Sequence, residues 1–261
     1  MNITIKSLCT SPLYAALWPA LAKFRDFEQL PHLSELNTEL SIDGITFVAQ
    51  ESKSNHFSDG YEPRIYLHGE VQTRERSWHD FFNALVWQQF PQSKKLINQL
   101  QYSLQKQRYP EKQRLPAENM LTLFDENGAI VIAQNPELLE LIKQHRWHEL
   151  FWQRRDEVRQ QLQVYIFGHG LYEKAINPYL GLTAQALLFV DTMPCCIDSL
   201  VAKYIGDHST QLKTDHVNPL PILGIPGWWA QNNNEDFYTN KAYFRDKPFT
   251  SSCKVNRESV C

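Results

Sequence analysis

Several patterns that would name a function directly are missing from this 261-residue sequence. It contains no Gly-x-Ser-x-Gly nucleophile elbow, no Walker-type phosphate loop and no Gly-x-Gly-x-x-Gly dinucleotide motif. The cysteines are odd in number and have no CxxC spacing, which excludes the common zinc and redox motifs; they are Cys9, Cys195, Cys196, Cys253 and Cys261. Cys195 and Cys196 adjoin an apolar stretch, so we expect buried, unreactive thiols there.

Neither sign of charge dominates, because 26 lysines and arginines oppose 29 aspartates and glutamates for a net charge of −3. This balance gives no global attraction to nucleic acid or to anionic membranes. The N-terminal residues lack the charged and apolar segments of a signal peptide, and no run of about 18 apolar residues occurs. We therefore expect a soluble cytoplasmic protein with no membrane segment.

The densest aromatic run lies between Ser77 and Pro91 and predicts a helix. Ser77 with Asp80 three residues later is typical of a capping box, and Pro91 predicts that the helix ends near Phe90.

His79 and Asn83 are four positions apart on this helix, so they are expected to project together along the edge of its apolar face. Such a pair fits a half-buried binding site, and it fits a hydrogen-bonded edge of a core equally well.

The fold class expected is α+β, with one mainly helical domain over residues 1–247, a small antiparallel sheet, and a flexible tail over residues 248–261. Strands are predicted at 45–49, at 64–67 and in a hairpin around the Asn127-Gly128 dipeptide. Helices are predicted at 12–23, 32–40 and 93–108, with a helical hairpin from Asn135 to about Asn177. The apolar residues 182–190 fit a buried strand or a helix.

A second candidate site is the segment Gly168-His169-Gly170-Leu-Tyr-Glu173. His169 and Glu173 are at helical spacing, so the carboxylate could orient the imidazole as a general base, or both could bind one divalent ion. The alternative is a core histidine satisfied by Glu173, with the glycines allowing tight helix packing.

Two histidines and four carboxylates would form a pool of metal ligands if three separate segments converged: His79, Asp80, Asp125, Glu126, His169 and Glu173. We expect no bound metal and no other cofactor, because each carboxylate has a structural use. Asp80 can cap its helix, Asp125 and Glu126 can serve as turn residues, and Glu173 can orient His169.

Basic residues occur in two places. Arg74 precedes the central helix and could neutralise an anionic ligand, although a solvated loop is the commoner outcome. A longer basic stretch is interleaved with tyrosines: Lys94, Lys95, Tyr102, Lys106, Arg108, Tyr109, Lys112 and Arg114. Because the net charge is acidic and no nucleic-acid motif is present, we interpret this stretch as a solvated helical face and expect no nucleic-acid partner.

Four groups of segments carry a family resemblance: Thr73-Arg74 with Trp78–Trp87 and Phe90-Pro91, then Leu123–Gly128, then Phe167–Lys174 with Gly181–Ala184, then Pro219–Pro221 with Gly227–Trp229. Together they resemble a bacterial family known as the domain of unknown function numbered 3025. The resemblance covers most of the chain from about residue 73 to 245, and the N-terminal third and the tail lie outside it. It implies no reaction, cofactor or partner.

Two function hypotheses follow. In the first, the two candidate helices enclose a polar pocket in which His169, Glu173 and His79 are catalytic. Ligand-binding residues would be Arg74, Asn83, Asp125 and Glu126, and the function would be hydrolysis of an anionic small molecule, with a metal-dependent hydrolase as a further alternative. Histidine rings on opposite sides of the core would exclude this hypothesis.

In the second hypothesis the protein is a non-enzymatic binding or scaffold protein. Its tryptophans at 147, 152, 228 and 229 would supply an aromatic surface for a protein partner. The partner is thus an unknown small molecule or protein, and the oligomeric state stays open.

Overall fold

The computed structural model describes residues 4–51, 56–191 and 196–247, and its larger sheet has four strands in the order β4-β3-β5-β6. These strands are β3 (Gly128–Ala133), β4 (Leu162–Ile166), β5 (Thr183–Val190) and β6 (Asn218–Pro221). Strand β3 pairs antiparallel with β4 and parallel with β5, and β5 pairs antiparallel with β6. The α+β class is confirmed, and the sheet is mixed because one of its three pairings is parallel.

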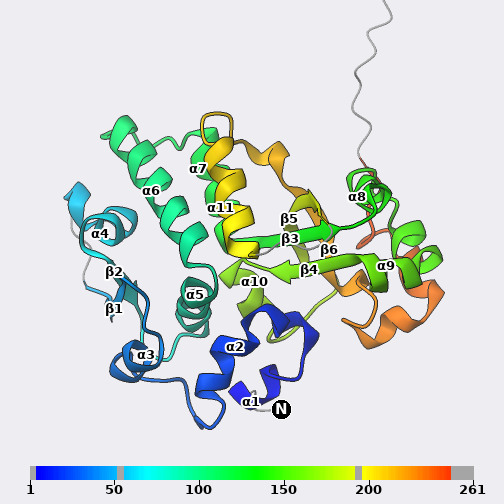
Figure 1. The fold of residues 1–261 in the computed structure, drawn as a ribbon, viewed down its shortest axis with the longest axis horizontal. Coiled ribbons are helices and arrows are strands. Elements are labelled where there is room, and N and C mark those ends of the chain that lie inside the picture. The colour runs from blue at the N-terminus through cyan, green and yellow to red at the C-terminus, as the bar shows by residue number, and fades with distance from the viewer. Residues whose placement is uncertain (1–3, 52–55, 192–195, 248–261) are drawn as a thin grey trace, which may run out of the picture.

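Strand β3 lies at the centre of the core. All six of its residues are buried, as expected for an inner strand covered on both faces. In the view of Figure 1, α7 (Pro116–Asn127) and α11 (Ile197–Asp207) lie above the strands, and α10 (His169–Lys174) and α2 (Trp18–Leu21) lie below them. One cluster of buried side chains runs through these layers.

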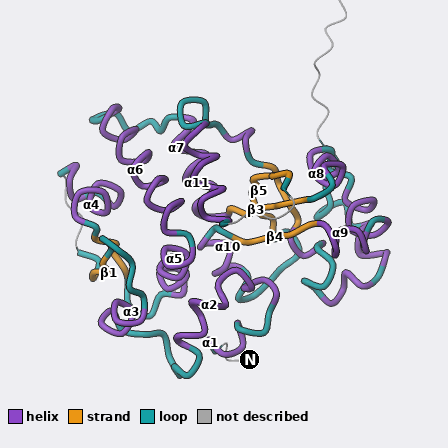
Figure 2. Tube along the Cα trace, in the orientation of Figure 1, coloured by secondary structure: helices purple, strands orange, loops and turns teal. Residues whose placement is uncertain are grey.

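A second, smaller sheet lies at the other end of the molecule in Figure 1. It consists of β1 (Thr46–Ala49) and β2 (Glu70–Thr73), which are parallel. Helices α3 (Leu33–Glu39) and α4 (Tyr61–His68) pack beside it. Figure 2 shows how far helices outweigh strands across the fold. The remaining helices are α1 (Ile5–Leu8), α5 (Trp78–Gln89), α6 (Pro91–Arg108), α8 (Pro136–Lys143) and α9 (Arg155–Gln161).

The central helix forms as its local signals predict. The amide N–H of Asp80 donates to Ser77 Oγ, and α5 ends at Gln89 with Phe90 as its C-cap, as predicted. Pro91 is then the first residue of α6, where a missing N–H costs nothing. The helix expected at 32–40, the strand at 45–49 and the strand alternative at 182–190 are also confirmed. In the part of the chain that the structure describes, no helix is long and apolar enough to cross a membrane.

The strand predicted at 64–67 is wrong, because these residues belong to helix α4. Pro63 lies in the first turn of that helix, where proline is tolerated, and Gly69 ends the helix with a left-handed φ of 69°. Ile65 is buried and Tyr66 stacks on Tyr102 of α6, whereas Leu67 is largely exposed, so contacts between helices outweigh the local β-propensity here.

The hairpin predicted around Asn127-Gly128 is also wrong. Helix α7 runs to Asn127 and β3 begins at once at Gly128, whose φ of −69° is not that of a tight hairpin turn. Glu118 bonds the N–H of Leu115 and fixes the start of the helix. Glycine is needed at position 128 because a Cβ there would lie 2.2 Å from the carbonyl oxygen of Phe124.

Two further helical predictions are corrected. The segment from Asn135 to Asn177 contains α8, a π-helical turn at Glu149–Gln153 and α9, but then strand β4 before α10. Residues 12–24 form α2 between two 3₁₀ segments, Pro12–Leu17 and Ala22–Phe24, because Pro19 cannot continue a regular helix. The tail predicted to be flexible, 248–261, lies outside the described residues.

Candidate functional site

The core of the site is built where α7 passes into β3 and β4 passes into α10. The amide N–H groups of Phe167 and Gly168 both donate to the carbonyl oxygen of Gly128, each at 2.9 Å. This contact places the last turn of α7, which carries Glu126, against the first residue of α10, which is His169. The Nε2 atom of His169 lies 3.5 Å from Oε1 of Glu126.

The two glycines around His169 make this close approach possible. A Cβ on Gly168 would lie 2.4 Å from the backbone nitrogen of Gly128, which cannot move away. A Cβ on Gly170 would lie 2.5 Å from Oε2 of Glu126 and 3.0 Å from its carbonyl oxygen. The Gly-His-Gly sequence is therefore required by the packing of α10 on the end of α7.

Helix α5 brings the second histidine. Because α5 packs directly on α10, the rings of His79 and His169 lie 4.6 Å apart at an interplanar angle of 73°. The Nε2 atom of His79 lies 4.0 Å from Oε1 of Glu126, so one carboxylate oxygen faces the Nε2 atoms of both rings. Ligand atoms of His79, Glu126 and His169 all lie within 4.8 Å of one another.

The other nitrogen of each ring faces a second carboxylate. Nδ1 of His79 lies 3.0 Å from Oε2 of Glu173, and Nδ1 of His169 lies 3.7 Å from Oδ2 of Asp125. The prediction that Glu173 orients His169 is therefore wrong, because Glu173 is bonded to His79. His169 is only 5% exposed, and its Nδ1 has no hydrogen-bond partner within the described residues.

A buried lysine bonds two of the polar side chains next to the histidines. Lys94 of α6 is 4% exposed, and its Nζ lies 2.6 Å from Oδ1 of Asp125 and 3.0 Å from Oδ1 of Asn83. The Asn83 amide also donates to the hydroxyl of Tyr61. Lys94 had been interpreted as part of a solvated face, and that is wrong. It neutralises Asp125, which leaves Glu126 and Glu173 as the carboxylates facing the histidines without a lysine or arginine partner among the described residues.

Arg74 and Asp80 form a separate pair. The carboxylate of Asp80 accepts from the backbone N–H of Arg74 at 2.7 Å and from its guanidinium at 2.9 and 3.0 Å. The side chain of Asp80 therefore bonds Arg74, and Ser77 alone caps α5. Because Arg74 is neutralised in this way, little of its charge is left for an anionic ligand.

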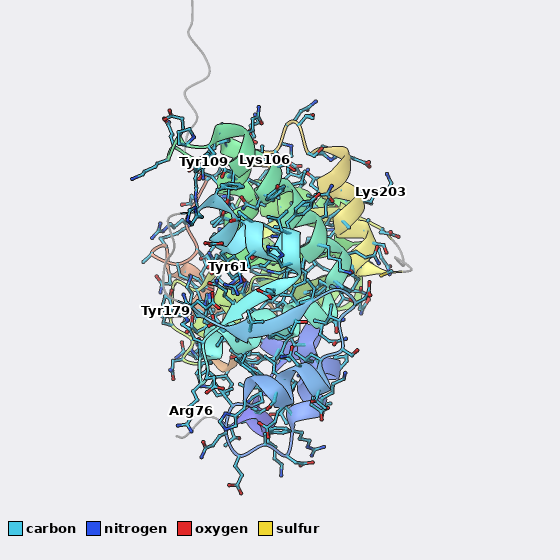
Figure 3. The ribbon with its side chains drawn as sticks, turned by 90° about the vertical axis from the view of Figure 1, so that its left-hand side faces the viewer. Tyr61, Arg76, Lys106, Tyr109, Tyr179 and Lys203 are labelled. Atoms are coloured by element: carbon cyan, nitrogen blue, oxygen red, sulfur yellow. The ribbon has the colours of Figure 1, made fainter. Side chains whose placement is uncertain are left out.

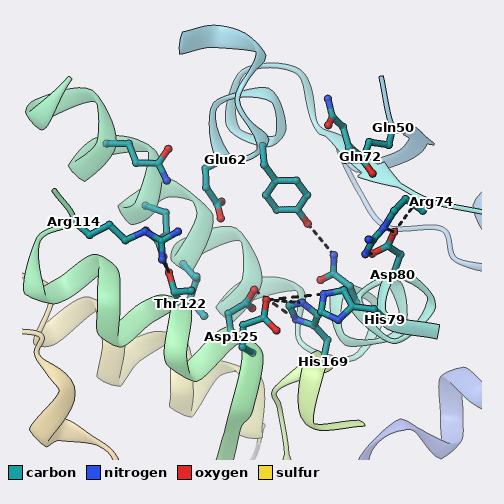
Figure 4. A pocket seen from close by; sticks show the side chains of 16 residues that line it. Gln50, Glu62, Gln72, Arg74, His79, Asp80, Arg114, Thr122, Asp125 and His169 are labelled. Atoms are coloured by element: carbon teal, nitrogen blue, oxygen red, sulfur yellow. Dashed lines mark hydrogen bonds and ion pairs between the residues drawn. The ribbon is translucent and has the colours of Figure 1, made fainter. Parts of the chain in front are cut away.

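These groups line one cavity of about 440 Å³ (Figure 4), within the usual range for a small-molecule site. Its wall is almost entirely polar, with the histidines at one end and the carboxyl of Glu62 pointing in from α4. The lining residues are Gln50, Tyr61, Glu62, Gln72, Arg74, His79, Asp80, Asn83, Ile97, Gln101, Gln105, Arg114, Thr122, Asp125, Glu126 and His169.

The structure thus brings the predicted residues His79, His169, Arg74, Asn83, Asp125 and Glu126 to one cavity, and Glu173 contacts His79 just behind it. Sequence reasoning missed Tyr61, Glu62, Arg114 and the role of Lys94. Tyr61 and Glu62 belong to helix α4, of which the sequence predicts only residues 64–67 as a strand, so no signal in their own segment points to them.

Two carboxyl groups of the cavity have shifted pKa values in opposite directions. The hydrogen bond from His169 holds the pKa of Glu126 at about 2, against the opposing effect of partial burial. Burial raises the pKa of Glu62 to about 7, and the bond from Asn98 offsets this only in part. At neutral pH Glu126 is therefore ionised, whereas the pKa of Glu62 lies close to neutral pH.

The tryptophans expected to form a binding surface for a protein partner are mostly buried. Trp147 is buried, and Trp152, Trp228 and Trp229 are partly buried against the core. The large exposed aromatic side chains include Tyr61, Tyr109 and Tyr179, which are spread over one face in Figure 3. Among the thiols expected to be buried, Cys196 is exposed at the start of α11, and Cys195 lies outside the described residues.

Comparison with known proteins gives one match. A family model described as a protein of unknown function, DUF3025, matches residues 45–248. No curated protein and no solved structure matches the chain.

Proposed function

The chain belongs to the DUF3025 family, and we propose that this member is a divalent-metal-dependent hydrolase acting on a small molecule bound in the polar cavity. The ion would be held by Nε2 of His79, Nε2 of His169 and a carboxylate oxygen of Glu126. Two imidazoles and one carboxylate leave further coordination positions open for water and substrate, which is the arrangement of catalytic sites.

One observation carries this proposal: each histidine turns one nitrogen toward Glu126 and the other toward a carboxylate. Glu173 stands behind His79 and Asp125 behind His169. The bond from Glu173 holds His79 as metal-binding histidines are held, because an outer carboxylate fixes the tautomer and raises the basicity of the ligand nitrogen. Asp125 faces His169 at 3.7 Å, which is too long for a hydrogen bond. The expectation of no metal assumed that Asp80 caps α5 and that Glu173 orients His169. In the structure Asp80 bonds Arg74 instead, and Glu173 bonds His79.

The ligand atoms of His79, Glu126 and His169 lie slightly farther apart than they would around a bound ion. Bonds of about 2.1 Å allow two ligand atoms on one ion to be at most about 4.2 Å apart. The distances from Glu126 Oε1 to the two Nε2 atoms, 3.5 and 4.0 Å, already satisfy this limit. The ligand atoms of the three residues lie within 4.8 Å of one another, and a small rotation of the His79 side chain, which is 26% exposed, would bring the two rings within the limit of about 4.2 Å.

The residues of this chain have distinct tasks in the proposed reaction. A bound ion would lower the pKa of a bound water toward neutrality and polarise the substrate. Glu126, His79 and His169 would fix the ion, and Glu173 and Asp125 would orient the two rings. Lys94 would hold the Asp125 carboxyl in place by bonding it.

Metal analysis tests the proposal. We expect protein purified without chelator to carry about one zinc, manganese or iron per chain, and this metal to be lost in His169→Ala and Glu126→Gln. His148→Ala is the matched control, because His148 forms a similar pair with Glu235 outside the cavity.

Activity is measured on chromogenic esters, amides and phosphate esters before and after chelation. Chelator-sensitive turnover that is lost in His169→Ala is the expected result. Protein that carries no metal and shows no thermal stabilisation by added Zn²⁺ or Mn²⁺ would overturn the metal site. Turnover that persists without metal would instead make His169 and Glu126 an acid–base pair that acts alone.

A further inference from the structure

Glu62 is an ionisable group that the proposed metal chemistry does not use. It lies in the first turn of α4 and lines the same cavity from the opposite wall, with its carboxyl directed inward (Figure 4). Asn98 Nδ2 donates to Oε2 of Glu62 at 2.6 Å and to its carbonyl oxygen at 3.0 Å. Within the described residues, Oε1 has no hydrogen-bond partner.

The cationic side chains nearest to Glu62 are bonded to other residues. Lys94 bonds Asp125 and Asn83, and Arg108 bonds Glu118. Arg114 is exposed at the edge of the cavity and donates to Thr122, so its charge is screened by solvent. In the described part of the chain, no lysine, arginine or histidine forms an ion pair with Glu62. A half-buried carboxylate in a cavity thus lacks a counter-cation of its own.

Among the residues that line the cavity, carboxylates also outnumber arginines. Four carboxylates line it, Glu62, Asp80, Asp125 and Glu126, against two arginines. Asp80 is neutralised by Arg74 and Asp125 by Lys94, while Glu126 faces the histidines. Glu62 and Glu126 then remain without a lysine or arginine ion-pair partner in the described part of the chain, against the solvent-exposed guanidinium of Arg114, so the cavity keeps an excess of negative charge that attracts a cation and repels an anion.

The residue before Glu62 adds a second recognition element. Tyr61 also lines the cavity and is 41% exposed, and its hydroxyl is fixed by the Asn83 amide at 2.9 Å. An aromatic face together with a carboxylate is the combination that binds ammonium groups, through cation–π attraction and a charge-assisted hydrogen bond.

We propose that the substrate of this cavity carries a positively charged amino group, which is bound by Glu62 and the ring of Tyr61 while the bond to be cleaved lies toward the histidines. This inference rests on the proposed function, because it names the substrate class of the same cavity. It replaces the anionic small molecule expected from Arg74, whose guanidinium is already bonded to Asp80.

The test uses three five-carbon probes whose terminal groups are positive, neutral and negative: 1,5-diaminopentane, 1,5-pentanediol and glutarate. Binding is measured by chemical-shift titration at pH 8, where Glu62 is ionised, on metal-free and on metal-loaded protein. We expect the diamine to bind both forms, and the diol and the diacid to bind at least tenfold more weakly. Because the metal-free form is included, the outcome does not depend on whether the metal site exists.

Variants assign the binding to its residues. Glu62→Gln keeps the shape and the bond from Asn98 and is expected to weaken diamine binding about tenfold. Glu140→Gln, on the exposed surface of α8, is the matched control and should leave it unchanged. Tyr61→Phe keeps the aromatic ring and should retain binding, whereas Tyr61→Leu should weaken it severalfold.

Equal diamine binding by the wild-type protein and Glu62→Gln would overturn the proposal, as would preferential binding of glutarate. Circular dichroism of each variant establishes that it is folded. A chain that binds the diamine but no metal would keep this inference and remove the metal site, and the reverse result would do the opposite.

Discussion

Nδ1 of His79 lies 3.0 Å from Oε2 of Glu173, and this bond joins α5 to α10 across 94 positions of the chain. His79 and Glu173 are both on the outer side of the site, while the Nε2 atom of His79 faces Glu126. Glu173 is 47% exposed, so the bond contributes little to folding, but it fixes the direction of the imidazole. Its importance should therefore appear in ligand affinity and not in stability.

The first prediction concerns this bond. Glu173→Gln should lower the affinity for Zn²⁺ about tenfold without changing the number of ions bound, because only the orientation and basicity of His79 change. Competition with a fluorescent chelator measures the affinity. Glu235→Gln is the control, since it breaks a His–Glu contact of similar length at His148. An unchanged affinity in Glu173→Gln would show that His79 is not a ligand.

The second prediction concerns Lys94. Lys94→Met should lower the free energy of unfolding by about 3 kcal/mol, because the partly buried Asp125 would lose its cationic partner. Its neighbour is a matched control: Lys95 is exposed and contacts the fully exposed Asp43 at 3.5 Å, so Lys95→Met should change stability by less than about 0.5 kcal/mol. Urea denaturation gives both values. Equal effects of the two substitutions would contradict the buried network.

The central helix and its successor could be predicted from sequence because their signals are local. The Ser77 cap, the apolar arc and Pro91 act within a few residues, and the structure follows them. The region 121–132 could not, since short apolar runs fit a helix or a strand equally well. There the Glu118 cap and the packing of Phe124 extend the helix to Asn127.

In the candidate site, too, the sequence predicts what depends on local signals and misses what depends on tertiary contacts. The residue types were recognisable, but the pairing of His169 with Glu173 was inferred from helical spacing, and helix α10 begins only at His169. Glu173 then faces α5, and the partners of His169 come from α7, more than forty positions earlier in the chain. Such contacts depend on how β3 and β4 pair, which no local pattern of the sequence contains.

The third prediction concerns Gly170. Gly170→Ala should displace the Glu126 carboxylate and destabilise the protein by about 1–2 kcal/mol, because the new Cβ would also press on the Glu126 carbonyl oxygen. Gly206→Ala is the control: this glycine lies within α11 with its nearest neighbour at 3.7 Å, so alanine should stabilise by about 0.5–1 kcal/mol. The two substitutions should therefore shift the denaturation midpoint in opposite directions. If Gly170→Ala also stabilised, the contact between α10 and Glu126 would be looser than the structure shows.

The fourth prediction concerns the pH dependence caused by Glu62. Burial, together with the charge of Asp125, raises its pKa from 4.5 to about 7, against the effects of Asn98, Lys94 and Arg114. The folded protein therefore binds this proton more tightly than the unfolded chain does. The resulting stability is fully present below pH 4.5 and is lost as the pH rises through 7.

Glu62→Gln removes this dependence while keeping the size of the side chain. The variant should match the wild-type protein at about pH 4 and exceed its free energy of unfolding at pH 8 by about 2 kcal/mol, somewhat less than a shift of this size would give in full. Urea denaturation at both pH values checks this, with Glu140→Gln as the exposed control. A Glu62→Gln protein that is less stable than the wild type at pH 8 would mean that the carboxylate already has a cationic partner in the fold. The same result would remove the reason for assigning an ammonium group of the substrate to this position.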